Sequence, residues 1–105
     1  MSKQKFIHLH VHTEYSLLDG LSNIGKLVAR IKKMGMDSVA ITDHGAMYGA
    51  FKFYIAAKSA GIKPIIGVEA YKAKDSRFDH PGGVARDQFH LTLLSKNFIG
   101  YQNLM

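Results

Sequence analysis

The sequence contains no cysteine and no tryptophan, and only two prolines occur among its 105 residues. Without cysteine, disulfide bonds and thiolate metal sites are excluded, so any bound metal ion must be held by nitrogen and oxygen ligands. The sequence also lacks an apolar run of the roughly 18 residues that a membrane-spanning helix needs, and it shows no apolar segment of signal-peptide length near its start. From these absences we expect a cytoplasmic protein that is not embedded in a membrane.

Acidic side chains are also scarce, because 8 Asp and Glu stand against 14 Lys and Arg, which gives a formal net charge of +6. A basic protein favours polyanionic partners such as nucleic acids. The basic residues are dispersed, however, with no run longer than two, so most of them are expected on a solvated surface. The chain has room for one domain, and its 47% of hydrophobic residues is typical of a globular fold.

The residue pattern predicts alternating strands and helices. Period-two alternation and short apolar runs indicate strands, whereas apolar residues three and four positions apart indicate helices. A βαβαβ order with short connections predicts a parallel α/β sheet with right-handed crossovers. The predicted elements are a strand over residues 5–11, a helix over 24–34, a strand over 38–42, a helix with the apolar stripe Met47, Ala50, Phe51 and Tyr54, and a strand over 65–68 within residues 62–70.

The last third of the chain predicts a loop, a strand and the start of a helix. Residues 72–86 are polar, contain Pro81, Gly82 and Gly83, and predict a loop in which His80 is solvated. Residues 88–94 predict a fourth strand, and residues 97–105 predict the first turns of a helix. This last helical pattern stops before it is complete, so we expect residues 1–105 to be a fragment of a longer protein.

Three histidines alternate in the first predicted strand, His8, His10 and His12, and therefore share one face of it. Burying three imidazoles without partners would cost about 1–3 kcal/mol each. A metal ion would satisfy them, because imidazole is a common ligand of zinc and similar cations. The alternative is a strand whose histidines are hydrogen-bonded at a surface or an interface.

Further side chains of ligand type follow the other predicted strands. Asp19 lies in the loop after the first strand, His44 follows the second, and Glu69 leaves the third. Because the carboxyl ends of parallel strands meet at one edge of the sheet, we expect these groups to converge there, with Glu69 as a bridge between ions. Asp43 precedes His44 and is expected to orient an imidazole. The candidate metal ligands are His10, His12, Asp19, His44, Glu69 and His90.

Three motifs resemble the first motifs of the polymerase and histidinol phosphatase superfamily, the PHP domain. They are residues 10–16 (HVHTEYS), 42–45 (TDHG) and 67–69 (GVE). The longer flanking text, including YSLLDG and GAFKFYIAAKSAGIKPIIGVEAY, resembles the N-terminal part of alpha subunits of bacterial DNA polymerase III. This resemblance implies a distorted barrel of seven βα units, of which residues 1–105 would be the first half. It also assigns the metal ligands to the same six residues and leaves His8 as a flanking residue.

The resemblance implies a longer parent protein that is a DNA-directed DNA polymerase, with DNA and other replisome subunits as partners. For this segment it implies metal-dependent phosphoester hydrolysis, which in some family members is a 3′ to 5′ exonuclease. Divalent ions are the expected cofactors, zinc or manganese in this centre and magnesium in the parent polymerase. The isolated chain is expected to be inactive and to self-associate. Two alternatives remain open: a free-standing phosphatase such as a histidinol phosphatase, and a non-catalytic scaffold that binds a proofreading subunit.

Overall fold

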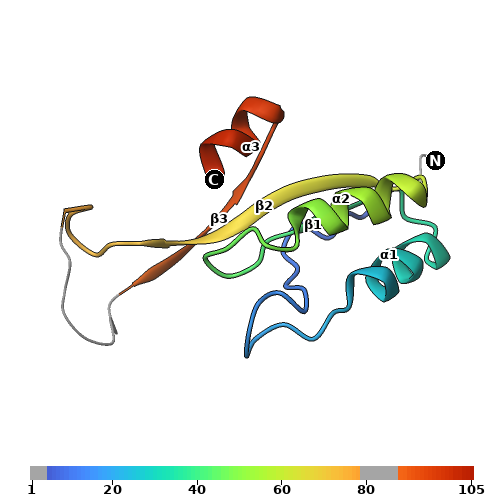
Figure 1. Ribbon diagram of the computed structural model, residues 1–105, viewed down its shortest axis with the longest axis horizontal. Coiled ribbons are helices and arrows are strands. Elements are labelled where there is room, and N and C mark those ends of the chain that lie inside the picture. The colour runs from blue at the N-terminus through green and yellow to red at the C-terminus, as the bar shows by residue number, and fades with distance from the viewer. Residues whose placement is uncertain (1–4, 79–87) are drawn as a thin grey trace.

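The computed structural model describes residues 5–78 and 88–105 (Figure 1). Its elongated shape measures 49 × 29 × 26 Å. The long hairpin of the last two strands projects away from the body that the first two helices form (Figure 1). In chain order the elements are α1 (Ile24–Lys33), β1 (Ser38–Ile41), α2 (Ala50–Ser59), β2 (Lys63–Lys72), β3 (Phe89–Leu94) and α3 (Phe98–Leu104).

Strands β1 and β2 pair in parallel, as the sequence predicts, with Ala40 opposite Ile65. The strand order in the sheet is β1-β2-β3. An isolated parallel bridge between His44 and Glu69 continues the β1–β2 register beyond the end of β1. Because side chains alternate along β2, Glu69 lies on the same face of the sheet as Tyr71. The register therefore places both of these residues beside His44.

The predicted first strand is present only as an extended segment. His8 forms a single parallel bridge with Val39, and the carbonyls of His8 and Val11 accept hydrogen bonds from the backbone of Ala40 and Thr42. The backbone N–H of Val11 donates to the Thr42 hydroxyl at 3.1 Å instead of to a backbone carbonyl. This side-chain contact interrupts the regular ladder, so the prediction of a full strand over residues 5–11 was wrong, although its position beside β1 was right.

Strand β3 runs antiparallel to β2, with His90 opposite Tyr71 and Thr92 opposite Glu69. The sequence predicted this strand but gave no direction for it, and the parallel βαβ pairing is limited to β1 and β2 in the described sheet. A parallel neighbour needs a crossover connection, usually a helix, whereas the sequence between β2 and β3 carries no helical stripe. The antiparallel direction brings the first residues of β3 next to the last residues of β2. That is the end of β2 at which Glu69 and Tyr71 lie.

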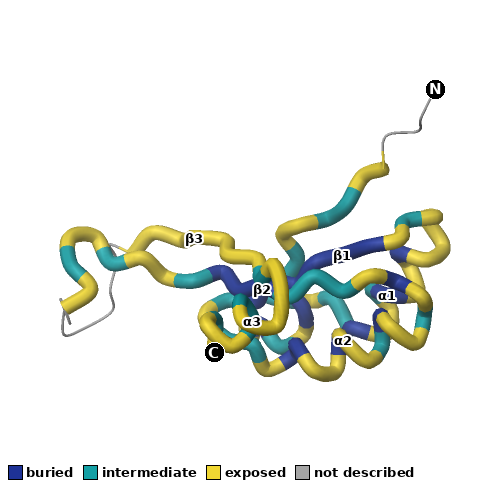
Figure 2. The backbone as a smooth tube through the Cα atoms, turned by 90° about the horizontal axis from the view of Figure 1, so that it is seen from above, coloured by how far each residue is buried: buried dark blue, intermediate teal, exposed yellow. Residues whose placement is uncertain are grey.

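The core lies where α1 and α2 pack against β1, and Figure 2 shows the buried segments gathered there. The apolar spacing in helix α1 predicts a stripe of Ile24, Leu27, Val28, Ile31 and Met34. The structure buries Ile24, Val28 and Ile31, whereas Met34 lies beyond the helix and is 47% exposed. Asn23 caps its start, because the Asn23 side chain accepts a hydrogen bond from the N–H of Lys26. All four residues of β1 are buried, as expected of a strand covered on both faces. These contacts fix the sheet that carries the site.

Helix α2 turns a different face to the core from the one that the sequence pattern predicts. Its buried residues are Ala50, Phe53 and Ala57, whereas Phe51 and Tyr54 are 75% and 46% exposed. The predicted stripe and the observed buried residues both have helical spacing, so spacing alone does not show which of the two faces is buried. The packing chooses Phe53, which is fully buried against the core. The predicted stripe was therefore correct for Ala50 and wrong for the two aromatic residues.

The second half of the described chain is largely exposed, as the tube in Figure 2 shows for β3 and α3. Every residue of β3 is exposed, and α3 buries none of its residues. A groove of about 500 Å³ runs between α2 and α3, lined by Tyr54, Ile66 and Phe98 among others. The predicted loop over residues 72–86, including His80, lies mostly outside the described residues. Within the described residues, no helix is long and apolar enough to cross a membrane.

Candidate metal centre

Glu69 occupies the centre of a histidine–carboxylate cluster on one face of the sheet. Glu69 lies inside β2, which continues to Lys72, so the expectation that it leaves the strand end was wrong. Its side chain is only 6% exposed. Glu69 Oε2 lies 2.6 Å from Nε2 of His10 and 2.6 Å from Nε2 of His12, and the two imidazole nitrogens are 3.1 Å apart. The cluster comprises His10, His12, Asp19, His44, Glu69 and His90.

The second oxygen of Glu69 faces the other histidines. Glu69 Oε1 lies 2.5 Å from Nδ1 of His90 and 3.9 Å from Nδ1 of His44. Nε2 of His44 is 2.6 Å from Oδ2 of Asp19. One carboxylate thus presents one oxygen to each of two groups of imidazoles, which is the position of a carboxylate that bridges two ions.

Asp19 reaches His44 from an exposed loop with an unusual backbone. Leu18, the preceding residue, has φ +70°, the left-handed region, which costs an ordinary residue about 1–2 kcal/mol. Gly20 follows, and a Cβ at Gly20 would lie 1.8 Å from the Thr13 carbonyl oxygen. The close approach of Gly20 to Thr13 therefore requires glycine. Asp19 itself closes a turn, in which its backbone N–H donates to the Ser16 carbonyl at 3.1 Å.

Asp43 is buried behind the cluster and acts differently from the expectation that it orients an imidazole directly. Its carboxylate accepts hydrogen bonds from the backbone N–H of Thr13 at 2.5 Å, the Thr13 hydroxyl at 2.8 Å and the Ser16 hydroxyl at 3.1 Å. The Ser16 hydroxyl in turn accepts a hydrogen bond from the His44 backbone N–H at 3.0 Å. Asp43 therefore fixes the turn after His12 and, through Ser16, the backbone of His44.

The pKa of the Glu69 carboxyl reflects two opposing effects. Burial acts to raise this pKa. Hydrogen bonds with the rings of His10, His90 and His12 act to lower it, as does the nearby His44 ring. The lowering effects prevail, and the pKa falls from an ordinary 4.5 to about 2. Glu69 is therefore a carboxylate at neutral pH, which is the form that metal binding requires.

The cluster fits divalent metal ions on three observations. First, it divides into three groups whose donor atoms all lie within 4.8 Å of one another: His10, His12 and Glu69; His12, Asp19 and His44; and His44, Glu69 and His90. Second, Nδ1 of His44 is buried with no hydrogen-bond partner, which an ion would supply. Third, imidazole nitrogen and carboxylate oxygen are suitable ligands for zinc and manganese.

Sequence reasoning identified all six members of the cluster but missed the residues that support it. Thr13 and Ser16 are buried polar residues of the HTEYS segment that bind Asp43. The sequence did hold a sign of this role, because Thr13 and Ser16 follow directly after His12, and Ser and Thr hydroxyl groups commonly form hydrogen bonds in turns. Tyr71 also contacts the cluster, through its ring. Its role could not be read from spacing, because it depends on the pairing with β3.

The chain matches known proteins over nearly its whole length. It is 52% identical over 104 residues to the DNA polymerase III subunit alpha of Borreliella burgdorferi, covering 98% of the chain and 9% of that protein. It is 54% identical over 100 residues to the same subunit of Helicobacter pylori, covering 95% and 8%. It is also 51% identical over 108 residues to that of Thermus aquaticus, covering 99% and 9%. The chain thus spans less than a tenth of the length of these relatives.

Two solved structures have a similar fold. A Bifidobacterium adolescentis protein assigned as a metal-dependent phosphoesterase matches 70% of this chain and 26% of its own, with 27% identity and a TM-score of 0.59. An amidohydrolase from Chromobacterium violaceum, with bound sulfate and no metal, matches 93% of this chain and 31% of its own, with 23% identity and a TM-score of 0.63. These likenesses support the expected α/β class and partial barrel.

The family follows from the motifs, the fold and these similarities together. The predicted motif residues converge on one face of the sheet, around Glu69. A family model for the PHP domain matches residues 8–105, which is nearly the entire chain. The relatives match over nearly the same extent, with 51–54% identity over 100–108 residues. This chain belongs to the PHP domain family.

Proposed function

We propose that the histidine–carboxylate cluster holds at least two divalent metal ions and that, in the complete protein, this centre hydrolyses phosphoesters. The observation that carries the proposal is the position of Glu69, whose two carboxylate oxygens face different imidazole groups. Metal ions so held supply a water of lowered pKa and neutralise charge on a phosphoryl group. Zinc or manganese suits the nitrogen and oxygen donors.

Different residues of the cluster would bind different metal ions. His10 and His12 would hold one ion with Glu69, and His90 and His44 would hold its neighbour. Asp19 would be a further ligand of an ion that lies near His12 and His44. Because Asp19, His10 and His90 are the exposed members of the cluster, a phosphate group would approach from their side. Asp43 would keep the loop and the His44 backbone in place.

Titration calorimetry with zinc tests the metal centre. The wild-type chain should bind at least one ion, and the variant with His12→Ala and His44→Ala should bind much more weakly. His8→Ala is the matched control, because His8 is on the same segment but its ring contacts Phe6 rather than the cluster. Equal zinc affinity in the wild type and the double variant would reject the site.

We also propose that the chain is the PHP segment, residues 1–105, of a longer cytoplasmic protein, a DNA polymerase III alpha subunit. The identities of 51–54% to such subunits support this proposal. The parent would be a DNA-directed DNA polymerase that uses magnesium and acts with DNA and other replisome subunits. The exonuclease test is cleavage of a 3′-labelled primer by the purified parent, with and without His12→Ala. No loss of cleavage in that variant would separate this centre from exonuclease activity.

The isolated chain should bind metal ions but hydrolyse phosphoesters too slowly to detect. Binding requires three or four ligands, whereas hydrolysis requires two ions at fixed spacing with an open position for water. We propose that further ligands lie in later segments of the parent. Chelator-sensitive cleavage of a phosphodiester by this chain alone would contradict that proposal.

The exposed edge of β3 also supports self-association of the isolated chain.

A further inference from the structure

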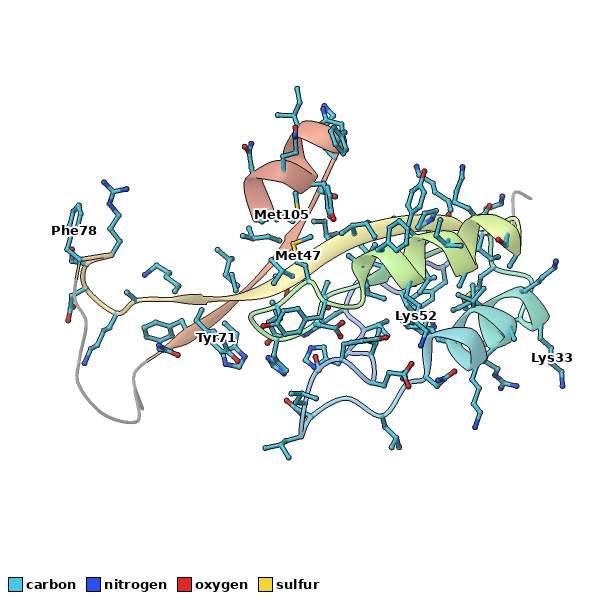
Figure 3. The ribbon with its side chains drawn as sticks, viewed as in Figure 1. Lys33, Met47, Lys52, Tyr71, Phe78 and Met105 are labelled. Atoms are coloured by element: carbon cyan, nitrogen blue, oxygen red, sulfur yellow. The ribbon has the colours of Figure 1, made fainter. Side chains whose placement is uncertain are left out.

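Tyr71 completes a cluster of aromatic rings at the proposed metal centre. Its ring stacks parallel to the His44 ring, with centroids 6.4 Å apart and 9° between the planes. It meets the His90 ring edge-on, with centroids 5.1 Å apart and 78° between the planes. The His44 and His90 rings are themselves 5.3 Å apart. Figure 3 shows Tyr71 on the side of the sheet away from α3.

The strand pairing and the glycine after His44 leave room for the Tyr71 ring. Tyr71 is the direct cross-strand partner of His90. The residue after His44 is Gly45, with φ +58°. A Cβ at Gly45 would lie 2.8 Å from Cε2 of Tyr71, so any larger residue would push the ring away from His44. A glycine is thus needed here both for its backbone conformation and for the Tyr71 ring.

The two imidazoles that Tyr71 contacts differ in how firmly the rest of the chain holds them. The His44 side chain is mostly buried and also bonds Asp19. The His90 side chain is about half exposed and stands on β3, an edge strand whose residues are all exposed. Apart from Glu69, the contacts of the His90 ring in the described residues are those with Tyr71 and His44. The His90 ring is therefore held by its hydrogen bond with Glu69 and by its ring contacts with Tyr71 and His44.

We infer that Tyr71 is a positioning residue, whose aromatic ring holds the His90 and His44 imidazoles in the orientation that metal binding requires. This inference rests on the proposed metal centre. Outer-shell partners that hydrogen-bond a metal-ligating imidazole fix its orientation, and their loss typically weakens metal affinity by about 10–100-fold. We expect an effect at the lower end of this range from the ring contacts of Tyr71. The ring, not the hydroxyl group, makes both contacts, so phenylalanine should replace tyrosine without loss.

The test compares zinc affinity by titration calorimetry in the wild type, Tyr71→Leu and Tyr71→Phe. Tyr54→Leu is the matched control, because Tyr54 is 46% exposed against 48% for Tyr71 and lies in the groove between α2 and α3. Carbon-13 relaxation of the His90 ring in the metal-free chain gives a second readout. We expect Tyr71→Leu to bind zinc about tenfold more weakly and to show a more mobile His90 ring, while the other two variants match the wild type.

The outcomes separate this inference from the proposed function. Wild-type affinity together with an unchanged His90 ring in Tyr71→Leu would overturn the positioning role. An equal loss in Tyr71→Phe would also overturn it, because the hydroxyl group would then be the active part. If the wild type binds no zinc, the metal centre is rejected, and ring mobility in the metal-free chain alone decides on Tyr71. Circular dichroism of each variant shows whether the fold is retained.

Discussion

A substitution of Asp43 tests whether its hydrogen bonds to Thr13 and Ser16 stabilise the fold around the cluster. Its carboxylate is buried and accepts three hydrogen bonds, two from Thr13 and one from Ser16. Thr13 and Ser16 are also buried, so water does not readily replace the lost acceptor. Asp43→Ala should therefore leave the Thr13 N–H unpaired, since a backbone donor cannot turn away as a hydroxyl group can.

The size of the effect follows from these three bonds. An unpaired buried donor costs about 1–3 kcal/mol, and each hydroxyl bond contributes about 1 kcal/mol. Asp43→Ala should thus lower the free energy of unfolding by about 3–5 kcal/mol. Asp43→Asn should cost only about 1–2 kcal/mol, because its amide oxygen still accepts from the Thr13 N–H and the Ser16 hydroxyl, whereas the bond that the Thr13 hydroxyl donates to the other carboxylate oxygen is lost. Asp43→Ala should also weaken zinc affinity about tenfold, because the His44 backbone is held through Ser16.

Urea unfolding followed by circular dichroism measures both variants. With a slope of about 2 kcal/mol per molar urea, Asp43→Ala should lower the midpoint by about 2 M and Asp43→Asn by under about 1 M. Asp75→Ala, at an exposed aspartate beyond β2, is the control and should leave the midpoint unchanged. A midpoint for Asp43→Ala equal to that of the control would refute the reasoning.

Three further predictions concern pH, assembly and DNA. Because the pKa of Glu69 is lowered from 4.5 to about 2 on folding, its stabilising contribution is complete above about pH 4.5 and is lost as the pH falls toward 2. In Glu69→Gln, the urea midpoint of unfolding should therefore depend less on pH between about 4.5 and 2 than it does in the wild type. The same pH dependence in both proteins would contradict a lowered pKa of Glu69. Light scattering should show dimers or larger assemblies, since Phe89 and Leu91 are exposed on the edge strand; a monomer at every concentration would count against this. Fluorescence titration should show weak, salt-dependent binding to single-stranded DNA, because the positive charge is dispersed, and tight salt-insensitive binding would contradict it.

The sequence predicted the helices and the parallel strand pair well because each has a local signal. Helix α1 has an apolar stripe, and the structure buries Ile24, Val28 and Ile31 of it. The direction of β3 has no local signal, since it depends on the connection and on pairing with β2. The buried face of α2 is likewise decided by packing, which selected Phe53 over Phe51.

The candidate site was more predictable than the fold around it. Metal-ligand residues are few in kind, so His10, His12 and Glu69 stand out against an apolar background, and the structure brings them together. The supporting contacts were harder to foresee, because the partners of Asp43 are a backbone N–H and two hydroxyl groups rather than an imidazole. Such contacts depend on three-dimensional turns, and spacing along the chain does not encode them.

The most direct test of the proposed centre is X-ray absorption at the zinc edge on the chain loaded with one equivalent of zinc. Coordination by the cluster predicts nitrogen and oxygen ligands at about 2.0–2.1 Å, with the outer-shell scattering of more than one imidazole. The spectrum should be unchanged in His8→Ala and should lose imidazole scattering in the variant with His12→Ala and His44→Ala. A wild-type spectrum of zinc surrounded by water oxygens, without imidazole scattering, would contradict the metal centre.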